Sequence, residues 1–218
     1  MNIKKTVIIN RAVPGSGKTT IWNSIIHTLK KYDLDITIHS TDEYFMVNGK
    51  YVFSLEKLNS FHQENMKSFK QSLEENKLIV ICDNTNISPW QTKPYTDMAR
   101  EYGYQIICIT FDPREIEKHV ESQIVTKEKP NAHGVPENII LQMIDEYFLF
   151  DNLLDKNSKI NPAKQLEYKW NDAEIRKEPT GLPSKYFDID YVIRILPNEY
   201  QEAKLNIGEW LMEIINGK

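Results

Sequence analysis

The sequence predicts a doubly wound α/β fold built on a parallel sheet. Short runs of β-branched and aliphatic residues alternate along the chain with segments long enough for helices, which is typical of strands joined by helical crossovers. The strand-like runs are apolar throughout, as expected when helices cover both faces of the sheet. A Gly-rich loop also lies directly between the first strand-like run and the first helix-like segment.

Five apolar runs are expected to form the strands of this sheet. In chain order they are Thr6–Asn10, Ile36–His39, Leu78–Cys82, Gln105–Phe111 and residues 188–196. We expect right-handed crossovers between them and the strand order 2-3-1-4-5. The first strand is then central, and residues 188–196 form the edge strand beside the fourth.

Three segments show a clear helical pattern. Residues 22–29 repeat apolar side chains at helical spacing, residues 137–150 do the same, and a last helix begins after Asn198, which can cap it. Between about 151 and 185 the chain is polar and has no clear period. We therefore expect a single domain over residues 1–218 with a peripheral insertion at about 151–185.

Composition excludes several classes of protein. Of the 218 residues, 40% are hydrophobic and 27% are charged, which excludes a fibrous or wholly disordered chain. The formal net charge of −4 provides no overall basic field for nucleic acid, and leaves room for a local basic groove. Cys82 and Cys108 lie within apolar runs and are expected to be buried core residues. No apolar run reaches the about 18 residues of a membrane span, so we expect a cytoplasmic protein.

The strongest functional pattern is a phosphate cradle at residues 12–19, Ala-Val-Pro-Gly-Ser-Gly-Lys-Thr. It fits G-x-x-x-x-G-K-[ST] except at the first position, where Ala12 requires a negative φ. A strand before the loop and a helix after it aim backbone N–H groups at the β- and γ-phosphates of a nucleotide. The alternative is a chance turn before a helix. The expected nucleotide-binding residues are Pro14, Gly15, Ser16, Gly17, Lys18, Thr19 and Thr20.

Within this cradle, two side chains have distinct expected roles. Lys18 neutralises the phosphates, and the Thr19 hydroxyl is placed to ligate magnesium. Ligands of open α/β sheets bind beyond the carboxyl ends of the strands, so the residues that follow the second and third strands are informative. Ser40–Phe45 follows the second strand and Asp83–Asn86 follows the third, so both segments bring carboxylates to the correct edge of the sheet.

Four ordered motifs carry a resemblance to a known family. They are Arg11–Thr19, Ser40–Met46, Cys82–Ile87 and Asn131–Pro136. Together they resemble the P-loop kinase domain of polynucleotide 5′-hydroxyl kinases, above all the group formed by the kinase domain of NEDD4-binding protein 2 and its bacterial and phage relatives. The resemblance covers about residues 5–150. It implies a kinase-type P-loop NTPase with three α/β/α layers and a lid between the fourth and fifth strands.

The resemblance also implies chemical roles. ATP supplies the γ-phosphate, Asp42 accepts the proton of the attacking hydroxyl, and Asp83 helps to hold Mg²⁺. The implied acceptor is a nucleic-acid 5′ end or a small hydroxyl substrate. Alternative interpretations are a cap or turn residue for Asp42 and a strand-end Asx turn for Asp83. His62 either lines the acceptor pocket or is a partly exposed helix residue, and Phe45 either stacks on a base or packs in the core.

The lid departs from the family pattern. In similar kinases a lid arginine reaches the transferring phosphate, whereas here Pro130 precedes Asn131 and the nearby cations are Lys127 and Lys129. Lysine supplies charge without the two-pronged geometry of arginine, so these two lysines become the candidate catalytic cations of the lid. If neither serves, the next candidates are Arg114 and Arg11. His133 is expected to pin the lid loop rather than to take part in the chemistry.

Three functions are compatible with these patterns. The first is an ATP-dependent kinase that acts on the 5′-hydroxyl of RNA or DNA. The second is a small-molecule kinase of the zeta-toxin or antibiotic-kinase kind, which shares the cradle and an aspartate after the second strand. The third is a nucleotide-binding interaction module with little catalysis, which the Ala at the first cradle position and the missing lid arginine would suit. ATP binding and phosphate transfer, measured separately, distinguish the third from the others.

Overall fold

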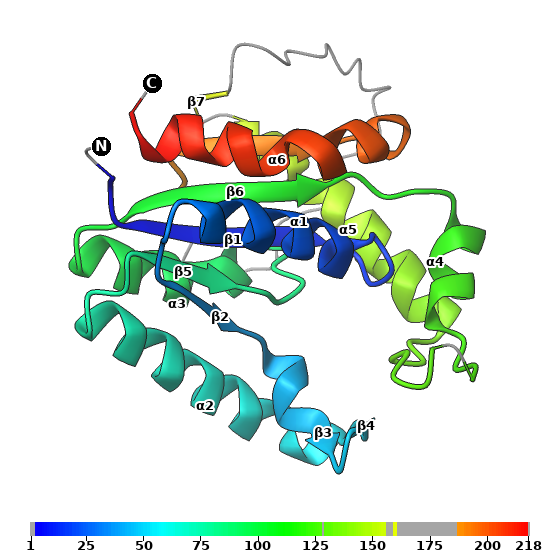
Figure 1. The fold of residues 1–218 in the computed structure, drawn as a ribbon. Coiled ribbons are helices and arrows are strands. Elements are labelled where there is room, and N and C mark those ends of the chain that lie inside the picture. Colours follow the sequence, from blue (N-terminus) through cyan, green and yellow to red (C-terminus); the bar gives the residue numbers. More distant parts are fainter. Residues whose placement is uncertain (1–2, 128, 156–158, 161–186, 218) are drawn as a thin grey trace.

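The computed structural model describes residues 3–127, 129–155, 159–160 and 187–217. Its elements alternate between strands and helices, as the sequence predicts (Figure 1). In chain order they are β1 (Thr6–Ala12), α1 (Lys18–Lys31), β2 (Ile36–His39), the 3₁₀ helix η1 (Thr41–Phe45), β3 (Met46–Val47), β4 (Lys50–Tyr51), α2 (Leu55–Glu74), β5 (Ile79–Cys82), α3 (Pro89–Glu101), β6 (Gln105–Phe111), α4 (Ile116–Gln123), α5 (Glu137–Asp155), β7 (Lys159–Ile160), β8 (Tyr191–Ile195), the 3₁₀ helix η3 (Pro197–Glu199) and α6 (Tyr200–Ile215).

The main sheet has the order β2-β5-β1-β6-β8-β7, and every pairing within it is parallel. The first five of these strands are the five predicted runs in the predicted order, with β1 in the centre. The edge assignment of residues 188–196 is wrong, because β7 pairs with the outer side of β8. A strand of two residues is too short to show a periodic pattern, and its sequence therefore carried no strand signal.

Helices cover both faces of the sheet and complete three layers (Figure 1). On one face, α1 and α6 pack over β1, with Ile8, Ile25 and Ile207 fully buried between them. On the other face, α2, α3 and the end of α5 cover the opposite side chains of the same strands, so that Val7 of β1 and Phe69 of α2 are both fully buried. All seven residues of β1 are buried, including the polar residues Thr6, Asn10 and Arg11 that flank its apolar centre.

The first residues of the segment expected to be an insertion, 151–155, belong to helix α5. Helix α5 continues beyond residue 150 to Asp155, because Phe150 and Leu154, one helical turn apart, are buried against the second face of the sheet. Residues 161–186 lie outside the described part of the chain. A single domain over residues 1–218 with a peripheral insertion at about 151–185 therefore remains a proposal that rests on the sequence.

Both cysteines are buried free thiols, as predicted. Burial raises the pKa of Cys82 and of Cys108 to about 12, so neither thiol ionises near neutral pH. Within the described ranges, no helix combines the length and the apolar character that a membrane crossing requires.

Candidate active site

The predicted phosphate cradle is a tight loop between β1 and α1. Gly15 and Gly17 adopt φ values of 83° and 87°, a region in which side chains with a Cβ are strained. The Ser16 hydroxyl donates to the Val13 carbonyl oxygen at 2.8 Å and closes the turn. Gly17 caps α1, so Lys18 and Thr19 occupy the first turn of the helix, where unpaired N–H groups favour an anion. Ala12 ends β1 and does not have a positive φ, as its side chain requires.

Helix α4 and the segment before it support the cradle from one side. His119 Nε2 accepts a hydrogen bond from the Arg114 backbone N–H at 3.0 Å, so its Nδ1 carries the proton and donates to the Pro14 carbonyl at 2.7 Å. Burial lowers the pKa of His119, which keeps this neutral form. The guanidinium of Arg114 donates to the Gly15 carbonyl. The sequence analysis missed His119, because nothing in its neighbourhood links it to a loop one hundred residues away.

Helix α6 supports the cradle from a second direction. The Tyr200 hydroxyl donates to the Gly17 carbonyl oxygen at 2.7 Å. A Cβ at Gly17 would overlap the Tyr200 ring, and a Cβ at Gly15 would overlap Ser122. The sequence pattern places Tyr200 on the apolar face of the last helix and contains no sign of this polar contact. The cradle is therefore held in shape by elements from the middle and the end of the chain.

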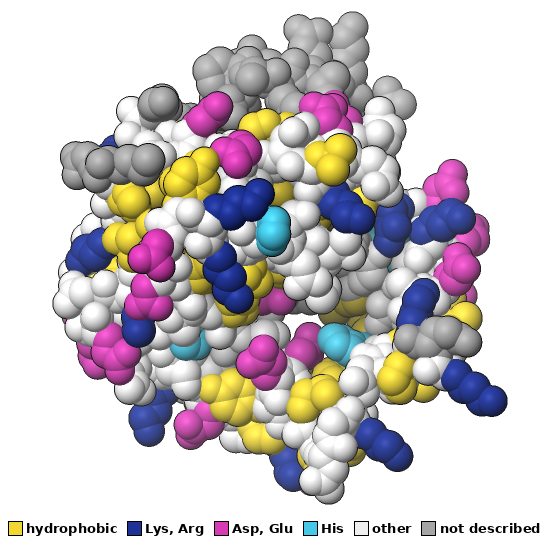
Figure 2. All heavy atoms as spheres, viewed as in Figure 1, with side chains coloured by type: hydrophobic (Ala, Val, Ile, Leu, Met, Phe, Trp, Pro, Cys, Tyr) yellow, Lys and Arg dark blue, Asp and Glu magenta, His cyan; other side chains and the backbone are white. Residues whose placement is uncertain are grey.

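Asp83 lies at the centre of the charged groups predicted for the site. Burial raises its pKa, the charge of Lys18 is the largest opposing influence, and the charges of Asp42 and His133 act on it as well. These groups therefore lie close enough to interact, although they come from four separate motifs. Figure 2 shows the surface hollowed in this region, between the body that carries α1 and the part that carries the β3–β4 hairpin.

The residues predicted to hold magnesium fit that ion. Asp83 Oδ1 is buried and forms no hydrogen bond of ordinary geometry with the described residues, although the Trp22 indole N–H lies close enough to lower the pKa of this carboxyl group, so the oxygen is available to a ligand. The Thr19 side chain is exposed in the first turn of α1. Within the described residues, no cluster of three or more His, Cys, Asp or Glu side chains could hold a metal by itself. Such a small donor set is typical of Mg²⁺ that is shared with nucleotide phosphates.

The residues after β5 connect the cradle strand to the segment that carries Asp42. Asn84 Oδ1 accepts from the Thr41 backbone N–H at 3.0 Å, and the Asn10 side chain donates to the Asn84 carbonyl at 2.7 Å. Asn86 adopts a positive φ and its side chain donates to the Asn10 carbonyl at 2.8 Å. These hydrogen bonds join segments far apart in the sequence, so the asparagines of this motif hold neighbouring strands together and do not form the local bonds of an Asx turn.

Asp42 lies in η1, directly beyond the carboxyl end of β2. Its side chain is half exposed, whereas the neighbouring Glu43 is exposed. Thr41 is hydrogen-bonded through its hydroxyl to His62 Nδ1 at 3.0 Å, which attaches η1 to α2. Burial lowers the pKa of His62, and the charge of Asp42 opposes that change. Phe45 is buried against Phe61 with ring centres 4.8 Å apart, so the core interpretation of this residue is correct.

Two side chains that the sequence analysis did not connect contact the Asp42 carboxylate. The Tyr51 hydroxyl donates to Oδ1 at 3.1 Å, and His133 Nδ1 lies 3.5 Å from Oδ2. The rings of Tyr51 and His133 are stacked, with centres 4.2 Å apart and planes 14° apart. His133 therefore pins the lid segment, as predicted, and its contact is the β3–β4 hairpin.

Comparison with known proteins assigns the chain to a family. The sequence pattern of a family described as an AAA domain matches residues 7–150. The chain belongs to this AAA domain family. NEDD4-binding protein 2 of Homo sapiens is 29% identical over 150 residues, which are 66% of this chain and 8% of that protein. The expected resemblance is confirmed, and the chain spans only a small part of that relative's length.

Solved structures with the same fold include a chain in the structure of the Pnkp1/Rnl/Hen1 RNA repair complex, with a TM-score of 0.57 and 18% identity over 71% of this chain and 48% of that one. A putative kinase from Chloroflexus aurantiacus has a TM-score of 0.56 and 13% identity over 96% and 98% of the two chains. Kti12 of Chaetomium thermophilum in complex with ADP-AlF3 has a TM-score of 0.53 and 11% identity over 97% and 100%. The AAA domain described here therefore has a P-loop kinase-like fold.

The candidate cations of this AAA domain differ in position. Lys127 and Lys129 are exposed on the segment between α4 and α5. Arg11 is fully buried and paired with Asp151 at 3.0 Å, so it is a core residue and cannot reach a phosphate. Arg114 contacts the cradle through the Gly15 carbonyl, and its Nε is buried without a partner among the described residues. Arg114 and Arg11 were the two further candidates for the role of the lid arginine, and only Arg114 lies at the site.

Proposed function

We propose that this chain is an ATP-dependent kinase that transfers the γ-phosphate to a hydroxyl group, with the 5′-hydroxyl of a polynucleotide as the acceptor. The observation that carries the proposal is the convergence of Lys18, Asp42 and Asp83 at the carboxyl ends of neighbouring parallel strands. A cradle for phosphates, an oxygen donor for a cation and a carboxylate beside open surface are the parts that phosphoryl transfer needs.

The proposed reaction assigns one task to each group. The cradle N–H groups and Lys18 bind the β- and γ-phosphates. The acceptor oxygen forms a bond to the γ-phosphorus while the bond between that phosphorus and the β–γ bridging oxygen breaks, which releases ADP. Asp42 takes the proton of the acceptor hydroxyl. Thr19 and Asp83 would hold Mg²⁺, which neutralises charge on the phosphates when it is bound with ATP.

The surface beside Asp42 supports an acceptor larger than a simple alcohol. Residues 46–55 form the β3–β4 hairpin and the approach to α2, and they expose several large apolar side chains next to the carboxylate. Exposed apolar and aromatic groups at such a place suit the stacking of nucleobases. The similarity to NEDD4-binding protein 2 and to a chain of an RNA repair complex points in the same direction. The exposed side chains are Met46, Val47, Val52, Phe53 and Leu55.

The test is phosphate transfer from ATP labelled on the γ-phosphate to a panel of acceptors. The panel contains 5′-hydroxyl RNA and DNA oligonucleotides, nucleosides and sugars, with 5′-phosphorylated oligonucleotides as blocked controls. We expect label on the 5′-hydroxyl oligonucleotides and none on the blocked ones. Label only on nucleosides or sugars would overturn the polynucleotide acceptor, and ATP binding without any transfer would overturn the kinase.

The Lys18→Ala variant tests the cradle. It removes the principal charge on the β- and γ-phosphates and leaves every core contact in place, so we expect transfer to be lost while the circular dichroism spectrum and the thermal transition stay unchanged. Turnover equal to that of the parent would contradict the assignment of the cradle.

A further inference from the structure

The expected base, Asp42, meets two side chains that come from other segments of the chain. Asp42 comes from η1, Tyr51 from β4 and His133 from the lid segment between α4 and α5. Each of the three contacts the other two: the Tyr51 hydroxyl lies 3.1 Å from Oδ1 of Asp42, His133 Nδ1 lies 3.5 Å from Oδ2, and the two rings are stacked. The carboxylate is thus held at both oxygens.

The lid contacts the same hairpin residue a second time. The Tyr51 backbone N–H donates to Asn131 Oδ1 at 3.3 Å, two residues before the stacked His133. Figure 1 shows the β3–β4 hairpin and the segment that follows α4 at the same end of the molecule. Tyr51 is therefore the point at which the lid and the hairpin are joined.

We propose that Tyr51 and His133 are positioning residues for Asp42, and that the lid must rest on the hairpin through their stacked rings for the carboxylate to be aligned with the acceptor hydroxyl. This inference rests on the proposed kinase function. It adds to that function a second task for the lid, which is separate from any charge that the lid brings to the γ-phosphate.

Physical arguments support a positioning role. The Asp42 side chain is 49% exposed, so without its two contacts it would sample several rotamers. Burial and the charge of Asp42 raise the pKa of Tyr51, so its hydroxyl keeps its proton and always donates. Two single contacts leave further lone pairs of the carboxylate available for the acceptor. Misalignment of a reacting group by about 1 Å can cost a hundredfold in rate, so alignment of this kind has measurable consequences.

The first experiment separates turnover from binding. Tyr51→Phe and His133→Phe preserve a ring for the stack and remove the polar contact with Asp42. We expect Tyr51→Phe to lower kcat about tenfold, the range of one hydrogen bond to a charged group, and His133→Phe to lower it less, because His133 Nδ1 lies 3.5 Å from the carboxylate. In both variants the Kd of ATP and the KM of the acceptor should stay within about twofold of the parent. The double variant should lose less than the product of the two single losses, because both substitutions release the same carboxylate.

Tyr44→Phe is the matched control. Tyr44 lies in the same 3₁₀ helix as Asp42, is also half-buried, and its hydroxyl pairs with Ser68 at 3.0 Å rather than with the carboxylate. We expect this variant to keep the kcat of the parent. If Tyr51→Phe has the same kcat as Tyr44→Phe while Asp42→Asn is inactive, the inference is overturned and the proposed function stands.

The second experiment does not depend on activity. Hydrogen exchange, followed by mass spectrometry on the parent without ligands, reports how firmly the peptide over residues 126–136 is held. Tyr51→Ala and His133→Ala remove the stack and should speed exchange in this peptide, whereas the two Phe variants should not. Unchanged exchange in both Ala variants would overturn the joint between lid and hairpin, even if the chain proved not to be a kinase.

Discussion

Asp42 and Glu43 are adjacent carboxylates with different surroundings. Asp42 is half-buried and is contacted by Tyr51 and His133, whereas Glu43 is exposed. A base must lie within hydrogen-bond reach of the proton that it removes, and only a carboxylate held at the site satisfies this requirement. Glu43 therefore provides a control for Asp42, because it carries the same carboxylate group without the contacts that hold Asp42 at the site.

We expect Asp42→Asn to lower kcat by about two to four orders of magnitude, the usual share of general base catalysis, because an amide cannot accept the acceptor's proton. The affinity for ATP should stay within a few-fold. Steady-state kinetics with saturating ATP provide the measurement, and Glu43→Gln should behave as the parent. A larger effect in Glu43→Gln would show that the neighbouring carboxylate is the base.

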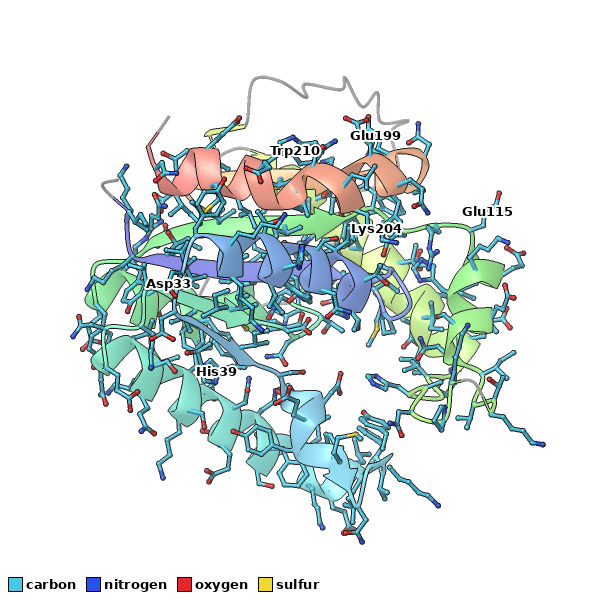
Figure 3. All side chains as sticks on the ribbon, in the orientation of Figure 1. Asp33, His39, Glu115, Glu199, Lys204 and Trp210 are labelled. Carbon is cyan, nitrogen blue, oxygen red and sulfur yellow. The ribbon has the colours of Figure 1, made fainter. Side chains whose placement is uncertain are left out.

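His39 provides a prediction about pH and stability. Its ring is buried between β2 and α2, where Nε2 pairs with the Ser72 hydroxyl at 2.9 Å (Figure 3). Burial lowers its pKa to about 4, whereas an unfolded chain binds the proton at about 6.5. Between these values the unfolded state holds a proton that the folded state lacks, so the free energy of unfolding falls as the pH is lowered through this window.

Urea denaturation at pH 7.5 and at pH 5 measures this effect. We expect the parent to lose more stability between the two conditions than His39→Asn does, because the variant no longer has the imidazole. His62 and His119 titrate in both proteins, so the difference between the two losses isolates His39. Equal losses in parent and variant would show that the imidazole of His39 is solvated in the folded state.

At the scale of elements, the lid segment between α4 and α5 is expected to bring a positive charge to the γ-phosphate. Lys127 and Lys129 lie on an exposed stretch between α4 and α5, and Pro130 stands where the resemblance described above leads us to expect an arginine. A charge that approaches the γ-phosphate only when the lid closes acts mainly in the transition state. Its removal should therefore change turnover rather than the affinity for ATP.

We expect Lys127→Ala or Lys129→Ala to lower kcat with little change in the Kd of ATP, and Pro130→Arg to raise kcat. The matched control is Lys31→Ala, at the far end of α1 from the cradle. Single-turnover transfer combined with ATP titration provides the measurement. If both lysine variants match the control and the arginine brings no gain, the charge comes from Arg114, which already contacts the Gly15 carbonyl.

At the scale of the whole molecule, a buried charge network ties together the carboxyl ends of the strands. Arg11 of β1 pairs with Asp151 of α5 at 3.0 Å, and Arg194 of β8 contacts both Asp151 and Asp112, at 3.0 and 2.7 Å. The Tyr147 hydroxyl also donates to Asp112 at 2.8 Å. The network joins β1, β6, β8 and α5 on the side of the sheet edge that carries the site.

We expect Arg11→Met to destabilise the protein by about 3 kcal/mol or more, because it leaves the single charge of Arg194 facing two buried carboxylates and removes the side-chain donor to the Ile87 and Tyr147 carbonyls. Lys93→Met is the control, since the exposed pair of Lys93 and Asp97 should contribute less than about 1 kcal/mol. Guanidinium denaturation at neutral pH measures both. A loss below that of the control would mean that Met packs well enough at this position to replace the network.

The sequence determined the parts of this protein that local patterns encode. Apolar runs predicted five strands and their order. The cradle followed from eight consecutive residues, because its glycines set the backbone of the loop and its lysine and threonine directly follow that loop. The positions of Asp42 and Asp83 followed from a general property of parallel sheets, whose carboxyl ends share one edge. These conclusions need no knowledge of distant contacts.

Tertiary structure alone decided which distant side chains complete the site. His119 and Tyr200 hold the cradle, and Tyr51 and His133 hold Asp42, across separations at which the sequence carries no signal. Tertiary structure also decided that Arg11 is a core residue. The sequence around Arg11 does not show whether a carboxylate from another segment pairs with it, and in the fold Asp151 does. The physical reason is common to all of these: hydrogen bonds and ion pairs depend on distances of a few ångströms, which only the folded packing of helices on the sheet sets.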